Sequence, residues 1–169
     1  MTSNARVAQL VEHRSEEPSV PGSSPGRGTA FAIRRIKQAD ANFVISSWVH
    51  NQRGSRVATL MGMSAWHGHY VPRVTRYVSE ALQRDSSLRI DCLVVGDDDD
   101  AIIGWAATRG PVLDYVYIKA GGRRMGNASA LLSAGSKPEL RTHETPDSDR
   151  YFAKLGLPLD PYSFAEAIP

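Results

Sequence analysis

The chain has 169 residues, of which 41% are hydrophobic, and a formal net charge of +2. This length corresponds to about one domain, and the apolar content is enough to bury a core. Acidic and basic residues are interspersed and form no basic stripe with aromatic residues, so no nucleic-acid partner is predicted. No run approaches the ~20 apolar residues that span a bilayer, and the N-terminus lacks the apolar core of a signal peptide. We therefore expect a cytoplasmic protein with no membrane partner.

The first 30 residues differ in composition from the rest of the chain. Residues 15–28 are dense in Ser, Pro and Gly and have almost no apolar periodicity, which is typical of disorder. Residues 7–15 also look like translation across the complementary strand of a transfer-RNA gene, which would place the true start near Ala30. The alternative is a short partner-binding helix at residues 5–13. We expect a disordered tail over residues 1–30 and one domain over residues 31–169.

The first part of the domain predicts one strand and two helices. The strand covers residues 32–36, and Asp40 can cap the helix that follows. Apolar residues at helical spacing define the two helices, with Val44, Ile45, Trp48 and Val49 in the first and Val74, Val78, Ala81 and Leu82 in the second. Residues 51–69 between them predict a long loop, and loops of this length are often functional.

Several polar groups in this region invite other interpretations. His67 and His69 could share a metal ion, but no third and fourth ligand has suitable spacing, so no metal site is predicted. Cys92 lies in an apolar alternation and is expected to be buried. The basic residues Arg34, Arg35 and Lys37 predict a solvated strand edge.

Three further strands are expected between residues 91 and 118. Residues 91–95 and 101–108 read as two strands joined by the polar turn 96–100, which we expect to be a solvated hairpin turn. Residues 112–118 form another apolar run, which ends shortly before a turn that carries two arginines. The alternation of strands and helices predicts a mixed α/β (α+β) fold.

This arginine-led turn opens a short helical stretch at residues 129–134. Its sequence is Arg123-Arg124-Met125-Gly126-Asn127-Ala128. The first N–H groups of a helix have no partner within the helix, so a turn without bulky side chains can hold a phosphate there. Gly126 and Ala128 keep the backbone accessible, and arginine adds fixed positive charge that grips phosphate oxygens.

The turn resembles the [Gln/Arg]-x-x-Gly-x-[Gly/Ala] signature of the GCN5-related N-acetyltransferase (GNAT) superfamily. Residues 102–107 are similar to the third strand of such enzymes, and residues 151–157 are similar to the segment that ends their fourth helix. The resemblance covers roughly residues 32–164, and small tailed-phage or prophage acetyltransferase-like proteins are the nearest match. It implies a mostly antiparallel sheet flanked by helices.

The resemblance also implies a function and a set of site residues. The turn from Arg123 to Ala128 would hold the pyrophosphate of acetyl-coenzyme A (acetyl-CoA), and the protein would transfer the acetyl group to an amine. The pantetheine arm would pair with the backbone of Val116 and Ile118, where the fourth and fifth strands separate in this superfamily. The linker between the first two helices would line the acceptor site. Neither the acceptor nor the oligomeric state can be read from the sequence.

The catalytic groups depart from the family pattern. Superfamily members often place a tyrosine acid at the second position of the aromatic pair in the fourth helix, where this chain has Phe152, with Tyr151 one residue earlier. One residue is about 100° around a helix, so Tyr151 is either a displaced catalytic acid or a packing aromatic. Asp114, His67, His69 and His143 remain candidates for the base. The alternative function is a non-catalytic interaction protein with the same fold, which still binds an acyl-CoA and acts on a host partner.

Overall fold

A five-stranded sheet lies at the centre of the computed structural model, which describes residues 31–96 and 98–166. The predicted tail and its alternative helix lie outside these residues. The strand order follows the chain, as β1 (Phe31–Arg35), β2 (Leu88–Val95), β3 (Asp98–Arg109), β4 (Val112–Ile118) and β5 (Leu140–Arg141). The first four strands pair antiparallel, and β4 pairs parallel with β5. The predicted mixed, mostly antiparallel fold is confirmed.

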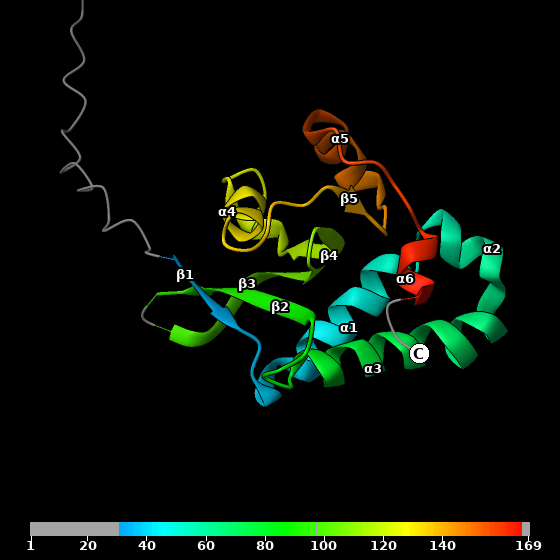
Figure 1. Ribbon diagram of the computed structural model, residues 1–169, viewed down its shortest axis with the longest axis horizontal. Coiled ribbons are helices and arrows are strands. Elements are labelled where there is room, and N and C mark those ends of the chain that lie inside the picture. Colours follow the sequence, from blue (N-terminus) through cyan, green and yellow to red (C-terminus); the bar gives the residue numbers. More distant parts are fainter. Residues whose placement is uncertain (1–30, 97, 167–169) are drawn as a thin grey trace, which may run out of the picture.

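Helices cover both faces of the sheet (Figure 1). On one face lie α1 (Ala41–Gln52) and α3 (Val71–Ala81), and on the other lie α4 (Asn127–Ser133) and α5 (Pro146–Leu155). The short α6 (Tyr162–Glu166) packs Phe164 against the α1 and α3 side. Within the described ranges, every helix is too short or too polar to cross a bilayer.

The larger core lies under α1 and α3, where most residues of the predicted apolar stripes are buried and Ile45, Val49 and Leu82 are partly buried. The ring of Trp48 stacks on Tyr115 at 5.0 Å between centroids and lies 5.3 Å from that of Trp105. Trp48 and Trp105 are both 0% exposed. Cys92 is buried as expected, and burial raises the pKa of its thiol to about 12. The sequence patterns therefore identified the parts of this core that come from α1, α3 and the strand of Cys92.

The expected long loop at residues 51–69 is wrong, because the segment is mostly helical. It contains α2 (Arg56–Ala65), whose first turn is capped by the Ser55 hydroxyl, and a π-helical turn, η2 (Trp66–Tyr70). Gly62, at φ 73°, interrupts α2, which is why one continuous apolar period is not visible in the sequence. Trp66 and Tyr70 are buried and stacked at 4.3 Å, and they tie this segment to the core.

The basic end of β1 is part of an ion-pair network and is not a solvated edge. The Arg34 guanidinium donates to Asp40 at 2.6 Å and to Asp99 at 2.6 Å, and Lys37 also pairs with Asp99. The side chain of Asp40 therefore serves Arg34 and the N–H of Lys37 and does not cap α1. The guanidinium of Arg34 holds the pKa of Asp40 below its usual value, although burial of this carboxyl opposes the shift.

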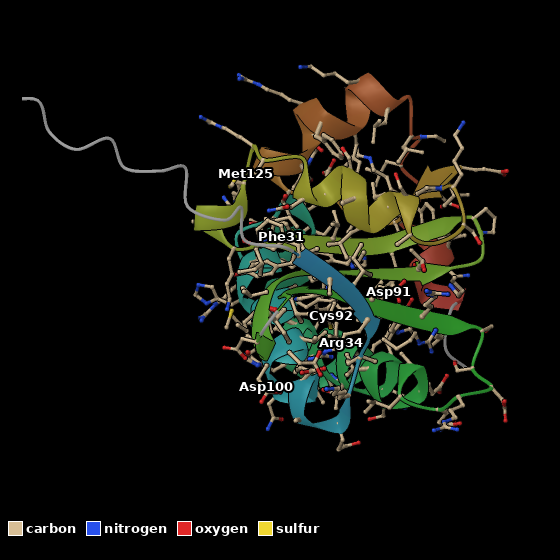
Figure 2. All side chains as sticks on the ribbon, turned by 90° about the vertical axis from the view of Figure 1, so that its left-hand side faces the viewer. Phe31, Arg34, Asp91, Cys92, Asp100 and Met125 are labelled. Carbon is tan, nitrogen blue, oxygen red and sulfur yellow. The ribbon has the colours of Figure 1, made fainter. Side chains whose placement is uncertain are left out.

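The hairpin between β2 and β3 also differs from the expected one. Residues 98–100 begin β3, so the acidic residues are not confined to a turn as expected. Figure 2 shows β1 crossing the front of the sheet, with Phe31 near its start and Arg34 near its end. The Lys37 and Arg34 contacts lower the pKa of Asp99, so this carboxylate anchors the end of β1 to β3.

Candidate functional site

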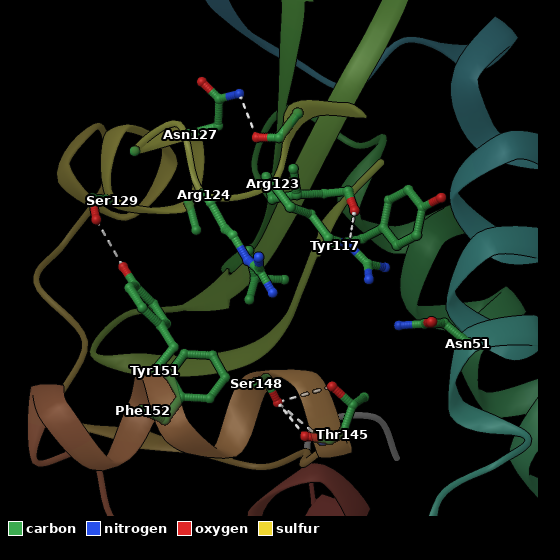
Figure 3. A pocket seen from close by; sticks show the side chains of 15 residues that line it. Asn51, Tyr117, Arg123, Arg124, Asn127, Ser129, Thr145, Ser148, Tyr151 and Phe152 are labelled. Carbon is green, nitrogen blue, oxygen red and sulfur yellow. Dashed lines mark hydrogen bonds between the residues drawn. The ribbon is translucent and has the colours of Figure 1, made fainter. Parts of the chain in front are cut away.

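A cavity of about 330 Å³ lies between the end of β4, the turn that leads to α4, and α5. Of the sequence-predicted site residues, Met125 is 64% exposed and does not line the cavity. All the others do, namely Val116, Ile118, Arg123, Arg124, Gly126, Asn127, Ala128 and Tyr151. Predicted residues from β4, from the turn and start of α4, and from α5 thus lie around one cavity (Figure 3).

Strand β4 separates from β5 beside this cavity. The two strands pair only at Val112 with Leu140 and at Leu113 with Arg141. The N–H of Lys119 donates to Ile103 on β3 at 2.8 Å. Because backbone groups alternate between the two edges of a strand, Val116 and Ile118 direct theirs away from β3 and toward the cavity. The Ile118 carbonyl there accepts a hydrogen bond from Arg123 Nε at 3.1 Å.

The turn between β4 and α4 is held in an unusual backbone shape. Gly126, the residue before α4, has φ 80°, and Arg124 has φ 64°, which an L-amino acid adopts only at a cost. Asn127 is buried and donates from Nδ2 to the Gly122 carbonyl at 2.9 Å, which closes the turn. A side chain at Gly122 would lie 2.6 Å from Ile103, so this position also requires glycine.

The cavity favours anions. Arg123 and Arg124 line it, and Figure 3 shows the side chain of Arg124 extending toward α5. Among the described residues, its lining contains no acidic side chain. Two guanidinium groups next to backbone N–H groups form a charge pattern that suits phosphate.

Tyr151 and Phe152 have different environments on α5. Phe152 is buried and packs against Leu131 and Leu132 of α4, with the Arg141 guanidinium 5.1 Å from its ring centre. Tyr151 instead turns toward α4, where its hydroxyl lies 2.9 Å from Ser129 Oγ (Figure 3). Both residues line the cavity, but Tyr151 contributes a hydroxyl to it whereas Phe152 belongs to the core.

Five further residues with polar side chains line the cavity and were missed by the sequence analysis, namely Asn51, Tyr117, Ser129, Thr145 and Ser148. Asn51 comes from the end of α1, and Thr145 and Ser148 from the start of α5. Thr145 and Ser148 form the capping box of α5, a spacing that the sequence displays and that could have placed them. Asn51 donates to the Tyr115 hydroxyl at 3.0 Å, a long-range contact that has no sequence signal.

None of the four candidate bases lines the cavity. His67 and His69 are exposed on η2. Asp114 is 0% exposed and bound by Tyr77 at 2.8 Å and by Arg109 at 3.3 Å, so its carboxylate has a structural role. Burial raises the pKa of Asp114, although the hydrogen bonds from Arg109 and Tyr77 act to lower it.

His143 lies behind the cavity, next to a void of about 10 Å³ that shares Val116, Thr145 and Ser148 with it. Its Nε2 is 2.9 Å from the Tyr70 hydroxyl, and its Nδ1 is 2.8 Å from Thr142 Oγ1. Burial lowers the pKa of His143 to about 3. The imidazole is neutral near pH 7 and is a weak base with both nitrogens engaged.

No protein-family model matches the chain, and no curated protein matches its sequence significantly. Solved structures do match. A possible acetyltransferase from Clostridium difficile 630 aligns over 76% of this chain and 90% of its own, with 12% identity and a TM-score of 0.50. An aminoglycoside N-acetyltransferase in complex with CoA aligns over 78% of this chain and 90% of its own, with 17% identity and a TM-score of 0.49.

The apo form of YjaB from Escherichia coli aligns over 62% of this chain and 63% of its own, with 15% identity and a TM-score of 0.45. The chain therefore spans less than two thirds of the length of YjaB. Identities this low establish the arrangement of strands and helices and not the activity. The structural match to the possible acetyltransferase from Clostridium difficile shows that this chain, a mixed, mostly antiparallel sheet flanked by helices, shares the fold of that protein.

Proposed function

We propose that the cavity binds acetyl-CoA and that the protein transfers the acetyl group to an amine acceptor. One observation carries this proposal: the backbone edge of β4 that faces away from β3 and the arginine-led turn line the same cavity. A free strand edge binds an amide chain, and an arginine-led turn binds phosphate. Acetyl-CoA contains both, since its pantetheine arm carries two amides and ends at a pyrophosphate.

The residues present fit this ligand. Val116 and Ile118 would pair with the amides of the pantetheine arm through their backbone groups. The residues from Arg123 to Ala128 would surround the pyrophosphate, with Gly126 allowing close approach and Met125 contributing only its backbone. The bound thioester would supply an acetyl group whose carbonyl carbon is open to attack.

In the proposed transfer, a neutral amine attacks the thioester carbonyl, the new C–N bond forms, and the C–S bond breaks. A backbone N–H of β4 stabilises the negative charge that develops on the carbonyl oxygen. The Tyr151 hydroxyl donates its proton to the departing thiolate, and the proton of the attacking amine leaves through water. We assign this proton to water because no carboxylate or imidazole lines the cavity within the described residues.

The lack of a carboxylate or imidazole in the described cavity lining also favours a second candidate. This candidate is a non-catalytic interaction protein that keeps the fold, binds an acyl-CoA and acts on a host partner. In addition, the Tyr151 hydroxyl already has a partner in Ser129. A tyrosine with a structural hydrogen bond and a cavity without a base would suit binding without turnover.

A free-thiol assay separates the two candidates. Acetyl-CoA is incubated with the protein and a panel of amines that includes polyamines, aminoglycosides, amino acids and peptide N-termini. Release of CoA thiol that depends on one class of amine supports acetyl transfer. Tight binding of acetyl-CoA with no thiol release over the whole panel supports the non-catalytic function.

A further inference from the structure

The strand β1 forms one edge of the sheet. In the part of the chain that the structure describes, β1 pairs with β2 on one side and with no strand on the other. Figure 2 shows β1 in front of the other strands, with Phe31 near its start and Arg34 near its end. An unpaired edge presents backbone N–H and C=O groups that can pair with a strand of another chain. This edge is therefore a candidate surface for strand pairing.

The alternation of hydrogen bonds along β1 decides which of its backbone groups face outward. Ile36, directly after β1, donates its N–H to the Ile90 carbonyl next to it on β2 at 3.0 Å. In an antiparallel pair every second residue bonds to the neighbouring strand, so the even-numbered residues of β1 also bond to β2. The odd-numbered residues Phe31, Ile33 and Arg35 direct their backbone N–H and C=O groups away from the sheet.

The side chains at this edge are apolar and exposed. Ile33 pairs with Leu93, a residue of the core under α4, so Phe31 and Ile33 lie on the α4 face of the sheet. Phe31 is 41% exposed and Ile33 is 37% exposed, because α4 packs on the inner strands and leaves β1 uncovered. The edge thus combines outward backbone groups with apolar surface that a partner strand would bury.

The charges of β1 select one way in which a second copy of the chain could pair with it. Parallel pairing in register would set Arg34 opposite Arg34 and Arg35 opposite Arg35, and like charges directly opposite each other are destabilising. Antiparallel pairing centred on Ile33 sets Phe31 opposite Arg35 instead. It also sets the small Ala32 opposite Arg34. The sequence of β1 is therefore complementary to itself in the antiparallel direction.

The two arginines are compatible with this arrangement. Arg34 pairs with Asp40 and Asp99 of its own chain, so its charge is balanced before association. Nη2 of Arg35 donates to the last carbonyl of α3 at 3.3 Å, which holds this guanidinium toward α3. The Arg35 carbonyl accepts a hydrogen bond from Arg34 Nη1 at 3.1 Å, and its second lone pair can accept the N–H of Phe31 in a second copy.

We propose that two copies of the chain form a dimer by antiparallel pairing of their β1 strands about a two-fold axis at Ile33. The backbone groups of Ile33 pair with those of Ile33 in the second copy, and those of Phe31 pair with Arg35. The two sheets become one continuous sheet, and the two-fold axis closes the assembly at two copies. Because β2 and β3 separate β1 from β4, the cavity stays open in the dimer.

Sedimentation velocity of the full chain over a range of concentrations measures this association. The mass of the parent should rise from 18.5 kDa toward twice this value as the concentration increases. The shared strand is short, so we expect a Kd on the order of 10–100 µM. A mass that stays at 18.5 kDa up to about 1 mM would overturn the proposal.

Substitutions at the two-fold axis test the register. Ile33→Lys places two ammonium groups opposite each other and Ile33→Glu two carboxylates, so each variant alone should be monomeric, with a Kd raised about tenfold or more. An equimolar mixture of the two should dimerise again, because lysine then faces glutamate. Leu60→Lys is the matched control, since Leu60 is 77% exposed on α2 and far from this edge, and it should dimerise like the parent. A dimer that persists in Ile33→Lys, or a mixture that stays monomeric, would contradict pairing at Ile33.

Amide hydrogen exchange of the full chain identifies the edge that is used. The outward N–H of Ile33 should become protected as the concentration rises, whereas the N–H of Arg34, which bonds to β2, should be protected at every concentration. A dimer whose Ile33 amide stays unprotected would place the interface elsewhere. An Ile33 amide that is protected in a monomer would show that another segment of the same chain covers the edge. Either result would overturn the proposal.

Discussion

The hydroxyl of Tyr151 lies 2.9 Å from Ser129 Oγ, and this hydrogen bond joins α5 to the first turn of α4. The contact holds the phenol in the lining of the cavity. A hydroxyl fixed in this way is either positioned for proton transfer or used only to hold the two helices together. The two roles predict different effects of removing it.

Replacing Tyr151 by Phe removes the hydroxyl and keeps the ring. If the hydroxyl protonates the departing thiolate, turnover should fall by the ~10²–10⁴ typical of lost general acid catalysis, with little change in acetyl-CoA affinity. The measurement is kcat by thiol release together with the Kd from calorimetry. Ser129→Ala is the control, because it removes the hydrogen bond and leaves the phenol. A rate for Tyr151→Phe equal to that of Ser129→Ala and the parent would assign Tyr151 to packing.

Arg124 combines backbone strain with a charge that faces the cavity. A non-glycine residue at φ 64° costs about 1 kcal/mol, so Arg124→Gly should raise the free energy of unfolding by roughly 0.5–1 kcal/mol. The same change removes a guanidinium from the proposed pyrophosphate site and should weaken acetyl-CoA binding by about tenfold or more. Urea unfolding and calorimetry measure the two effects.

Arg124→Lys keeps the positive charge at the same backbone angle and serves as the matched variant. It should restore most of the affinity and none of the stability gained by glycine. Loss of stability in Arg124→Gly, or unchanged binding, contradicts the assignment of this strained residue to ligand binding.

Burial of His143 makes stability depend on pH. Its pKa is lowered from 6.5 to about 3 in the folded protein, so between these values the unfolded chain binds more protons. The free energy of unfolding should therefore fall as the pH falls from about 6.5, by at most about 1.4 kcal/mol per pH unit. Urea unfolding at pH 7, 6 and 5 measures this slope.

Asp40, Asp99 and Asp160 have lowered pKa values and lose their contributions only as the pH approaches their usual value of 3.8, so they do not produce this slope. The raised pKa of Asp114 acts in the opposite direction, because the folded protein then binds the proton more readily than the unfolded chain, and it reduces the slope. His143→Gln removes the titrating group. The variant should show a smaller slope between pH 7 and 5, and a slope equal to that of the parent would show that another group titrates.

The N-terminal tail is expected to be dispensable. Its Ser, Pro and Gly content and its likeness to translated transfer-RNA sequence indicate that it adds nothing to the folded domain. Deletion of residues 1–28 should leave the Tm and the affinity for acetyl-CoA unchanged. A fall in Tm of more than a few degrees would show that the tail packs on the domain.

Local patterns predicted the elements that have strong periodicity. The apolar run of β4 was placed at its observed bounds, and the buried stripe of α3 was identified from Val74 and Val78. The helical segment before α3 was missed because Gly62 breaks its period and because Trp66 and Tyr70 are buried through a π-helical turn. Only tertiary packing makes that segment regular.

Part of the candidate site could be predicted, because some of its residues lie in local motifs and others are brought to it only by folding. The turn residues and Tyr151 lie in motifs whose chemistry can be read locally, and all except Met125 line the cavity. Asn51 reaches the same cavity from α1, far away in the sequence, and only the folded chain brings it there. The positions of Asp114 and His143 outside the cavity could not be read from the sequence either, since their partners Tyr77 and Tyr70 come from distant elements.

Gly126 gives the most direct test of acetyl-CoA binding at the turn. Both Gly126, at φ 80°, and Gly110, at φ 56°, have open space around the position that a Cβ would take. Valine at either position therefore costs a comparable backbone strain of about 1 kcal/mol or more, but only Gly126 lines the cavity. Calorimetric titration of the parent, Gly126→Val and Gly110→Val with acetyl-CoA separates strain from obstruction. We predict that the parent and Gly110→Val bind one equivalent and that folded Gly126→Val binds none, whereas binding by Gly126→Val at the affinity of the parent would contradict the proposed site.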